Sequence, residues 1–495
     1  MTTVYVSKVN ETSLKVESDD YNVLFELREH FSFFAPNYKH SPKFKDHIWD
    51  GKIYLLNMKT KTIPYGLIHH VQKFCTDRNY LFVDQTKKGK IIISDNLDEF
   101  DKFVESLKLP FKPYDYQLDA VKTAIRDVRR LLISPTGSGK SLIIYMLLRW
   151  MHKHGRRTCI IVPSTSLVEQ MVADFKKYSE NDDSFDTATL VDRLYSKVKT
   201  DPFQSNILVS TWQSLITYDE SLGSEWDCVI CDEVHLGKST SIQKILNSAK
   251  NAPYRIGLTG SLTGEDVHEF ILIGSFGLVH RVATTKELQE SGQLSDMRIY
   301  MLMLRYSKEE STNLYRNIGK DYNTEYKFIT THAKRALFVR NLACSLKGTV
   351  MVLFDSREHG ELLYNLINEK LAESGRKVFH IDGRVKVSTR EEIRLAVNSE
   401  NGAIIVASVG TSATGLNIPS IENVILCPSK SRVRNLQSIG RGLRLNKGKS
   451  RCNVFDLCDN LSYGNHKNYF LNHGMQRYSL YQQEGFDVVF EEVTF

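Results

Sequence analysis

The sequence predicts an α/β protein with two doubly wound parallel-sheet domains and a small α+β domain in front of them. Three observations lead to this prediction. The chain has 495 residues, which is too long for one hydrophobic core. Two separate series of short apolar runs alternate with helical stretches, a pattern typical of parallel sheets covered by helices. Pro110 and Pro113 precede the first series and indicate a domain boundary there.

The N-terminal α+β domain is expected to span residues 1–110. Its short alternating stretches predict strands, and its amphipathic stretches predict helices. We expect the strands at 3–9, 13–16, 53–56 and 91–94, and the helices at 22–30, 66–75 and 95–109.

The first parallel-sheet domain is expected to span 111–282. Apolar runs of strand length, rich in β-branched residues, recur here between helical stretches. We expect its buried strands at 130–134, 158–162, 206–210, 227–231 and 255–258.

The second parallel-sheet domain is expected to span 283–458. It begins less regularly at 296–335, with a strand at 298–305 and then a polar stretch, 307–327, and we expect 296–335 to carry an insertion or a hairpin. Its remaining strands are expected at 349–354, 377–381, 403–407, 423–427 and 452–457. A helical tail with an acidic end, 459–495, is expected to follow.

The composition is that of an ordinary globular protein, with 41% hydrophobic and 25% charged residues. No apolar run reaches the roughly 18 residues that a membrane span needs, and the N-terminus lacks a signal-peptide pattern. We therefore expect a cytoplasmic protein with no membrane partner. The net charge of +7 is modest for this size, so local clusters of charge matter more than the whole.

The eight cysteines are scattered along the chain. Cys228 and Cys231 have metal-like spacing, but they lie in a predicted buried strand. Residues three apart in a strand point to opposite faces, so these two cannot share a zinc ion. We expect neither a metal cluster nor disulfides.

Residues 134–141, SPTGSGKS, are typical of a phosphate-binding loop between a strand and a helix. Backbone amides of such a loop surround the phosphates of a nucleotide, helped by the helix dipole. Lys140 would reach the terminal phosphates, and Ser141 would ligate Mg²⁺. A serine, Ser134, stands where the first glycine of the general pattern is usually found. The residues expected to bind ATP here are Thr136, Gly137, Ser138, Gly139, Lys140 and Ser141.

Asp232 and Glu233 directly follow the predicted strand 227–231. Their carboxylates should therefore emerge at the carboxyl edge of the sheet, where ligands bind in open α/β sheets. Asp232 would hold Mg²⁺, and Glu233 would orient and deprotonate the attacking water.

A basic run near the C-terminus supplies a possible second half of the site. Residues 430–451 contain eight Lys or Arg and no Asp or Glu. Arg441 and Arg444 are three residues apart, so on a helix they share one face, and neither loses its charge at neutral pH. If this face meets the phosphate-binding loop across a cleft, ATP hydrolysis requires closure of that cleft.

Together these motifs, in this order, resemble those of superfamily 2 helicases. The resemblance covers residues 113–444 and implies two RecA-like domains. Residues 163–170 and 210–213 resemble motifs Ia and Ib, 259–261 motif III and 407–418 motif V. In the family, motifs Ia and Ib are strand-ending loops that grip the phosphates of one DNA strand. We accordingly expect DNA contacts from Ser164, Thr165, Thr211, Trp212, Gln213, Ser408 and Thr411.

The same resemblance assigns roles to further residues. Arg441 and Arg444 would be arginine fingers, and Gln437 would be contacted by His235 so that domain closure is sensed. Gln117 resembles the adenine-reading Q motif, and Gly415 of motif V would contact the nucleotide. The chain departs from the pattern at Tyr114, where an arginine is common, and at Asn417, where an acidic residue is usual. These departures weaken the expectations of strict adenine selectivity and of nucleotide contacts from the second domain.

The N-terminal domain resembles that of the phage recombination helicases in this superfamily. The resemblance rests on Phe31-Ser-Phe-Phe, on residues 41–56 around Trp49-Asp50-Gly51 and on Pro64-Tyr-Gly-Leu. Taken from the residues alone, Lys43, Lys45 and Lys52 beside Trp49 would suit contacts to a duplex backbone. A solvated charged face, or a hairpin turn with a packed tryptophan, is the alternative.

The leading hypothesis is an ATP-dependent DNA helicase or translocase that uses ATP and Mg²⁺ and is monomeric or weakly oligomeric. The resemblance implies action on branched DNA (forks, Holliday junctions and R-loops) in recombination, repair and replication, with 3′-to-5′ movement. Two alternatives stay open: an RNA helicase or restriction-type translocase, and an ATP-gated clamp or annealing protein. The sequence does not identify a strand-separating wedge, for which the irregular stretch 296–335 is the natural place.

Overall fold

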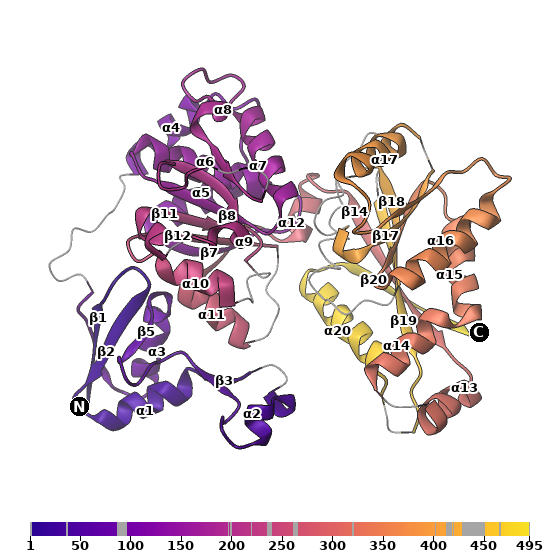
Figure 1. The fold of residues 1–495 in the computed structure, drawn as a ribbon, viewed down its shortest axis with the longest axis horizontal. Coiled ribbons are helices and arrows are strands. Elements are labelled where there is room, and N and C mark those ends of the chain that lie inside the picture. The colour runs from indigo at the N-terminus through magenta and orange to yellow at the C-terminus, as the bar shows by residue number, and fades with distance from the viewer. Residues whose placement is uncertain are drawn as a thin grey trace. The chain divides into compact units, whose positions relative to one another are not determined.

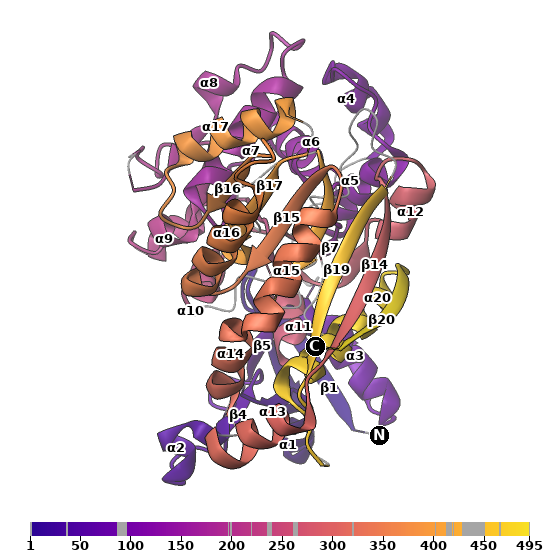
Figure 2. The ribbon, with the colours of Figure 1, turned by 90° about the vertical axis from the view of Figure 1, so that its right-hand side faces the viewer.

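The structure is a computed structural model (Figures 1 and 2). It describes residues 2–35, 38–86, 97–196, 198, 200–218, 220–234, 240–260, 266–318, 321–400, 402–411, 418, 420–427, 451–464 and 467–494. The chain divides into two compact units. The first comprises 1–134 and 138–283, and the second comprises 284–495 with the loop residues 135–137. No helix among the described residues is long and apolar enough to cross a membrane.

The N-terminal region of the first unit is a four-stranded sheet, in the order β5-β2-β1-β6, with helices packed on it. Alternate residues of β1 and β2, such as Val4, Val6, Leu14 and Val16, are fully buried. The strands are β1 (Thr3–Lys8), β2 (Ser13–Ser18), β5 (Thr62–Pro64) and β6 (Leu81–Asp84), and the helices are α1 (Tyr21–His30) and α3 (Ile68–Asp77). The expected last helix of this domain, 95–109, forms α4 (Phe100–Ser106), but it packs on the parallel-sheet region instead, with the ring of Phe103 4.9 Å from that of Trp150. The α+β prediction is confirmed, while the expected strand 91–94 lies outside the described residues.

A separate antiparallel hairpin leaves this sheet. It consists of β3 (Ser32–Phe34) and β4 (Lys52–Tyr54), with a 3₁₀ turn, η1 (Tyr38–His40), and a short helix, α2 (Pro42–Lys45), between them. Figure 1 shows β3 and α2 as an arm that extends from the rest of the N-terminal domain. The expected strand 53–56 therefore belongs to this arm and not to the main sheet.

The remainder of the first unit contains a seven-stranded, entirely parallel sheet in the order β13-β7-β12-β11-β8-β10-β9. Its strands are β7 (Arg129–Ile133), β8 (Thr158–Val162), β9 (Asp192–Leu194), β10 (Ile207–Thr211), β11 (Cys228–Cys231), β12 (Tyr254–Thr259) and β13 (Val279–Arg281). Every residue of β8, β10, β11 and β12 is buried, because helices cover both faces. All five strands predicted here are confirmed, and the short edge strands β9 and β13 were missed.

Helices flank this sheet on both sides. Figure 1 shows α5, α6 and α7 on one face and α10 and α11 on the other. The elements outside the sheet are α5 (Asp115–Asp127), α6 (Lys140–Lys153), α7 (Thr165–Tyr178), α8 (Thr187–Leu190), α9 (Trp212–Leu215), η4 (Glu220–Glu225), α10 (Thr240–Ser248) and α11 (Asp266–Phe276).

Helix α11 is also the surface on which the N-terminal domain packs. The ring of Phe270 lies 5.1 Å from that of Phe33 and 5.2 Å from that of His70. Gly66 approaches α11 so closely that a Cβ there would lie 1.9 Å from the carbonyl oxygen of Ile273. A side chain at Gly66 would force the N-terminal domain and α11 away from each other.

A buried ion pair reinforces the same contact. Arg129 at the start of β7 binds Glu11 of the N-terminal domain at 2.6 Å, and its guanidinium lies 4.2 Å from the ring centroid of Tyr65. Burial lowers the pKa of Arg129, and Glu11 opposes that effect. One continuous hydrophobic cluster runs from Val4 to Phe276, so the N-terminal domain and the sheet behind α11 form one body.

The second unit has its own seven-stranded parallel sheet, in the order β16-β17-β15-β18-β19-β14-β20. Its strands are β14 (Asp296–Arg305), β15 (Thr349–Phe354), β16 (Val378–Ile381), β17 (Ile404–Ser408), β18 (Ile421–Leu426), β19 (Arg451–Asn460) and β20 (Asp487–Thr494). Helices α15 (Ala333–Ser345) and α16 (Arg357–Leu371) cover one face, and α20 (Tyr469–Gln483) covers the other (Figures 1 and 2). The unit also contains α12 (Thr285–Glu290) and α17 (Val387–Ser399). Two parallel-sheet domains with a small α+β domain are therefore confirmed.

The C-terminal segment 459–495 was expected to be a helical tail, and the structure corrects that description. After α20 the chain forms β20, which pairs in parallel with β14 at the edge of the sheet. The acidic residues of β20 face arginines of β14: Arg298 binds Asp487 at 2.7 Å, and Arg305 binds Glu492 at 2.6 Å. The acidic end is thus an edge strand whose carboxylates pair with arginines of the neighbouring strand, β14.

The stretch 296–335 was expected to carry an insertion or a hairpin; it begins with β14, and the described residues of its polar part, 307–327, are mostly helical. They form α13 (Lys308–Asn313), a π-helical turn (Leu314–Ile318) and α14 (Tyr322–Thr331). Glu325 is 1% exposed and accepts hydrogen bonds from the backbone N–H groups of Tyr469 and Phe470 in the first turn of α20. A carboxylate at a helix N-terminus is favourable, so this segment belongs to the domain core and offers no projecting hairpin in its described residues.

Candidate active site

The phosphate-binding loop joins β7 to α6 through two glycines in left-handed conformations. Gly137 has φ +90° and Gly139 has φ +79°, which side-chain-bearing residues rarely adopt. A Cβ on Gly139 would also lie 2.3 Å from Nε2 of Gln117. The loop therefore depends on glycine for both backbone conformation and space.

Ser134, the departure from the usual glycine, has a structural role in this loop. Its hydroxyl forms a 2.6 Å hydrogen bond with the hydroxyl of Ser138, and both residues are completely buried. The serine at position 134 thus ties the two ends of the loop together.

Gln117 lies beneath the loop. Its Nε2 donates to the carbonyl oxygen of Ser138 at 2.8 Å, and its Oε1 accepts from the backbone N–H of Tyr114 at 3.0 Å. The residue is 3% exposed and completes the capping box of α5. In this structure Gln117 supports the loop, and an adenine contact stays a prediction.

Asp232 and Glu233 follow β11, and Lys140 lies beside them. Lys140 Nζ is 3.7 Å from Glu233 Oε1 and donates to the carbonyl oxygen of Ser134 at 3.1 Å. Burial, followed by the charge of Glu233, raises the pKa of Asp232 to about 7, and Lys140 acts in the opposite direction. Glu233 has φ +50°, a conformation that costs a non-glycine residue about 1–3 kcal/mol and is typical of functional sites.

The two carboxylates should destabilise the nucleotide-free protein at alkaline pH. Because the folded pKa of Asp232 lies above its ordinary value of 3.8, its favourable contribution is complete below about pH 4 and is lost as pH rises through 7. We expect Asp232→Asn to raise Tm by a few degrees at pH 8 and by little at pH 5, while hydrolysis is abolished. Thermal unfolding at both pH values, with the exposed Asp183→Asn as control, measures this. Equal Tm values at pH 8 would contradict it.

The residues at this edge fit a bound Mg²⁺. A serine hydroxyl and a carboxylate are the hard oxygen donors that Mg²⁺ prefers, with phosphate oxygens and water as its other ligands. Ser141, in the first turn of α6, and Asp232, directly after β11, supply those donors at the carboxyl edge of the sheet. The described residues contain no cluster of three or more His, Cys, Asp or Glu residues, and a Mg²⁺ held with phosphates needs none.

Tyr178, at the end of α7, contacts the serine predicted to ligate the metal. Its hydroxyl forms a 2.8 Å hydrogen bond with Ser141 Oγ. Burial raises the pKa of Tyr178 to about 12, so the phenol is neutral at physiological pH. Helix α7 begins after Ser164, in the loop predicted to grip DNA, so one helix connects that loop to Ser141.

We expect Tyr178→Phe to raise the Mg²⁺ concentration needed for nucleotide binding by about three- to tenfold, the value of one hydrogen bond. We expect the phenol oxygen to accept the Ser141 proton, which directs a serine lone pair toward the cation. A Mg²⁺ titration of fluorescent-nucleotide binding measures the effect without turnover. Tyr195→Phe, whose hydroxyl binds Glu169, is the control. The role is wrong if both variants titrate like the wild type.

The loops resembling motifs Ia and Ib lie together in the first unit. Strands β8 and β10 are adjacent, with Val162 opposite Thr211, so their carboxyl ends meet at one edge. Gln213 Nε2 approaches the carbonyl oxygen of Pro163 at 3.5 Å and links the two loops.

The predicted DNA residues of these loops differ in accessibility. Thr165 and Gln213 are exposed, whereas Thr211 is 3% exposed and forms a 3.1 Å hydrogen bond with Ser214. Ser164 caps α7, and Trp212 packs partly against the core. Thr165 and Gln213 are thus the side chains most available to DNA.

In the second unit, Ser408 and Thr411 form a local hydrogen-bonded pair. Ser408 Oγ donates to Thr411 Oγ1 at 2.8 Å, and Thr411 is 7% exposed. The other residues of this half that the sequence analysis singled out lie outside the described residues: Gly415, Asn417, Gln437, Arg441 and Arg444. His235 of the first unit lies outside them too.

In the N-terminal domain, the predicted basic residues separate into two groups. Lys43 and Lys45 on α2 are exposed. Trp49 donates its indole N–H to the carbonyl oxygen of Lys52 at 2.8 Å, and Lys52 binds Glu29 at 2.6 Å. Trp49 and Lys52 therefore hold the arm together, and Lys43 and Lys45 remain available to a ligand.

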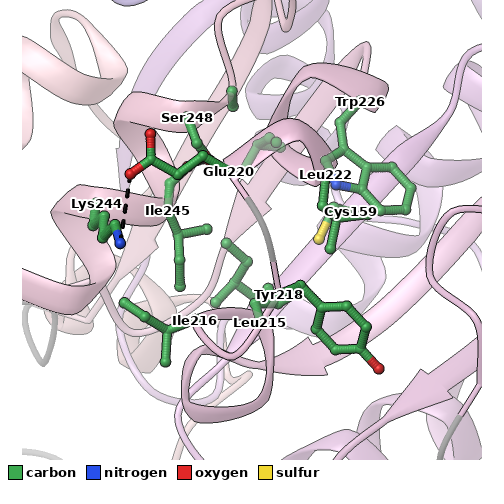
Figure 3. Close-up of a pocket in the computed structure, with 14 residues that line it drawn as sticks. Cys159, Leu215, Ile216, Tyr218, Glu220, Leu222, Trp226, Lys244, Ile245 and Ser248 are labelled. Carbon is green, nitrogen blue, oxygen red and sulfur yellow. Dashed lines mark hydrogen bonds and ion pairs between the residues drawn. The ribbon is translucent and has the colours of Figure 1, made fainter.

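An apolar pocket in the first unit is distinct from this site. It lies beside α9, η4 and α10, encloses about 470 Å³ including space open to solvent, and is lined by residues such as Leu215, Trp226 and Ile245 (Figure 3). Its charged residues, Glu220 and Lys244, pair with each other at 3.5 Å. Because Glu220 pairs with Lys244 and would repel a phosphate, this pocket does not suit nucleotide phosphates.

Sequence reasoning missed the Ser134–Ser138 and Ser141–Tyr178 contacts. The serine at position 134 was a visible departure and could have suggested a compensating hydroxyl in the loop. No local signal links Tyr178 to Ser141, because the two are 37 residues apart and meet only through packing of α7 on α6.

Three family models match the chain. They are "Type III restriction enzyme, res subunit" over residues 110–263, "DNA helicase UvsW, N-terminal" over 7–84 and "Helicase conserved C-terminal domain" over 333–446. They match the first parallel-sheet domain, the N-terminal domain and the second parallel-sheet domain, respectively.

Individual proteins show the same relationship. The chain is 32% identical over 492 residues to the ATP-dependent DNA helicase uvsW of Enterobacteria phage T4, covering 95% of each chain. The crystal structure of T4 UvsW matches 99% of both chains with a TM-score of 0.52 and 28% identity. A DNA-bound Type ISP restriction-modification enzyme, LlaBIII, shares the fold alone, with a TM-score of 0.54 and 15% identity over 78% of this chain and 32% of that one. The sequence relationship along nearly the whole chain shows that this protein belongs to the UvsW family of superfamily 2 helicases.

Proposed function

We propose that the protein is an ATP-dependent DNA helicase that unwinds and branch-migrates forks, Holliday junctions and R-loops in recombination, repair and replication. One observation carries the proposal: the phosphate-binding loop, the Asp232–Glu233 carboxylates and the Ia and Ib loops share one edge of a parallel sheet, in a chain of the UvsW family. The match to the UvsW N-terminal domain supports branched DNA as the substrate.

On the ATP side, Lys140 binds the terminal phosphates and Glu233 orients the attacking water. The 3.7 Å contact between them holds both side chains in place before the nucleotide arrives. Ser141 and Asp232 hold Mg²⁺, which when bound supplies positive charge against the phosphate oxygens. Gln117 fixes the loop from below, so its contact with adenine depends on a change in its hydrogen bonds.

The second unit completes the site in this proposal. Arg441 and Arg444 reach the γ-phosphate when the domains close, His235 contacts Gln437 as closure is sensed, and Gly415 contacts the nucleotide. Thr165 and Gln213, with Ser408 and Thr411, grip one DNA strand, so each cycle of closing and opening moves the grip along it. We also propose that the enzyme is monomeric or weakly oligomeric and works in the cytoplasm.

Unwinding of four substrates tests the proposal: a forked DNA, a Holliday junction, an R-loop and an RNA duplex. We expect ATP-dependent opening of the DNA junctions and the R-loop, with little action on the RNA duplex. Displacement of streptavidin from a tailed DNA is expected too, because a motor pushes it off whereas a clamp leaves it in place. Preferential opening of the RNA duplex would favour an RNA helicase, and retained streptavidin would favour a clamp.

A further inference from the structure

The tip of the β3–β4 arm is a compact structure that projects an apolar side chain. The backbone N–H groups of Ile48 and Trp49 both donate to the carbonyl oxygen of Lys43, which closes the turn after α2. Gly51 has φ +80°, and a Cβ there would lie 2.4 Å from the ring of Tyr38. The tip is therefore held by backbone hydrogen bonds and close packing.

Ile48 is the most exposed large hydrophobic residue of the described chain, at 75%. Burying an isoleucine stabilises a folded protein, and the free protein lacks that stabilisation here. A single exposed apolar residue is ordinary by itself. Ile48 differs because a second exposed apolar side chain lies in the same arm. Phe34, 52% exposed, stacks on Tyr38 with the ring centroids 4.6 Å apart.

The charges around Ile48 favour a polyanion. Lys39, Lys43 and Lys45 are exposed, and no carboxylate among the described residues forms an ion pair with them. Asp50, in contrast, accepts hydrogen bonds from Lys52 N and the Tyr54 hydroxyl, which lowers its pKa. Asp46 is the remaining acidic residue at the tip, so the lysines outnumber it.

The arm stands on a fixed base. Phe33 of β3 packs on Phe270 of α11, and Phe31, just before β3, lies 6.3 Å from the same ring. Helix α11 follows the motif III loop at Thr259 and Gly260 by a few residues. A side chain can separate paired DNA strands only if the segment that carries it does not yield when pressed against the duplex. The contacts of Phe31 and Phe33 with Phe270 hold the arm in place.

We propose that the arm is the strand-separating wedge, with Ile48 pressed against the last base pair at a DNA branch point. Lys43 and Lys45 bind the flanking phosphates, and the Phe34–Tyr38 stack offers a surface to a released base. Apolar side chains such as isoleucine are the type that enters between base steps. The exposed apolar side chains Ile48 and Phe34 lie among lysines, whereas the core of a protein interface is depleted of charged residues.

This inference rests on the proposed function and is tested with Ile48→Ala in the full chain. We expect fork unwinding to fall about tenfold, because the apolar side chain that enters between the base steps is shortened. Single-stranded-DNA-stimulated ATP hydrolysis and streptavidin displacement should stay within about twofold of wild type, since neither needs a duplex to be opened. Val9→Ala, 50% exposed in the same domain, is the matched control.

A second readout needs no ATP. With 2-aminopurine at the last base pair of a fork, binding of wild type should increase fluorescence, and Ile48→Ala should lose that increase while binding the fork. Phe34→Ala should weaken it, compared with Phe25→Ala, which is 48% exposed on α1. Unchanged unwinding and fluorescence in Ile48→Ala would overturn the wedge, as would an equal loss of ATP hydrolysis. A wild type that opens no fork would instead refute the proposed function, and the fluorescence would still test the wedge.

Discussion

Lys140→Ala should reduce DNA-stimulated ATP hydrolysis by at least about 10²-fold, the scale seen when one fixed charge-stabilising donor is removed. Its ammonium is held 3.1 Å from the Ser134 carbonyl oxygen and 3.7 Å from Glu233, so it is positioned before substrate arrives. Steady-state phosphate release with saturating single-stranded DNA measures the loss, and fork unwinding should fall with it.

Lys153→Ala is the matched control for this change. Lys153 ends the same helix, α6, and makes an exposed 3.4 Å ion pair with Glu99, so its removal should leave turnover unchanged. Undiminished hydrolysis in Lys140→Ala would show that the loop is not the catalytic phosphate site.

Arg441→Ala and Arg444→Ala should each lower kcat by about 10³-fold or more, as expected for arginine fingers, with nucleotide binding largely kept. A guanidinium that reaches the γ-phosphate only on closure stabilises the transition state and contributes little to the ground state. The measurements are kcat from phosphate release and the Kd of a fluorescent nucleotide.

Arg394→Ala provides the comparison for the arginine variants. Arg394 lies on α17 of the same unit and pairs with Glu391 in the adjacent turn, so its loss should leave kcat unchanged. If both finger variants turned over like Arg394→Ala, the γ-phosphate would be stabilised by other residues. A matching loss of nucleotide affinity would indicate a ground-state contact.

Sequence reasoning predicted well those elements in which nearly every residue is apolar because every residue is buried. Strands β8 and β11 are continuous apolar runs because helices cover both faces, so their position and parallel arrangement followed from composition. The phosphate-binding loop was equally readable, since its glycines are required by φ values that few other residues adopt.

The elements it missed are stabilised by partners distant in sequence. Strand β20 is largely exposed and rich in acid, and it becomes a strand because β14 offers a backbone ladder and matching arginines. The helix at 308–313 did carry a local signal, the Ser307–Glu310 capping box, which was overlooked because the stretch is polar. The roles of Trp49 and Lys52 in the arm depend on Glu29 and on a backbone carbonyl, which no sequence pattern shows.

The N-terminal domain packs closely on helix α11, through Gly66 on one side and around Phe270 on the other. This packing limits how substrate preference can be exchanged between related enzymes. A chain cut at residue 111 would expose the aromatic face of α11 and leave Arg129 without Glu11. Its loss of activity would therefore report damage to the ATP-binding sheet as well as lost recognition. A chimaera that takes its N-terminal domain from another enzyme must also take the residues of α11 that face this domain. The smallest transferable unit is therefore the N-terminal domain together with that face of α11.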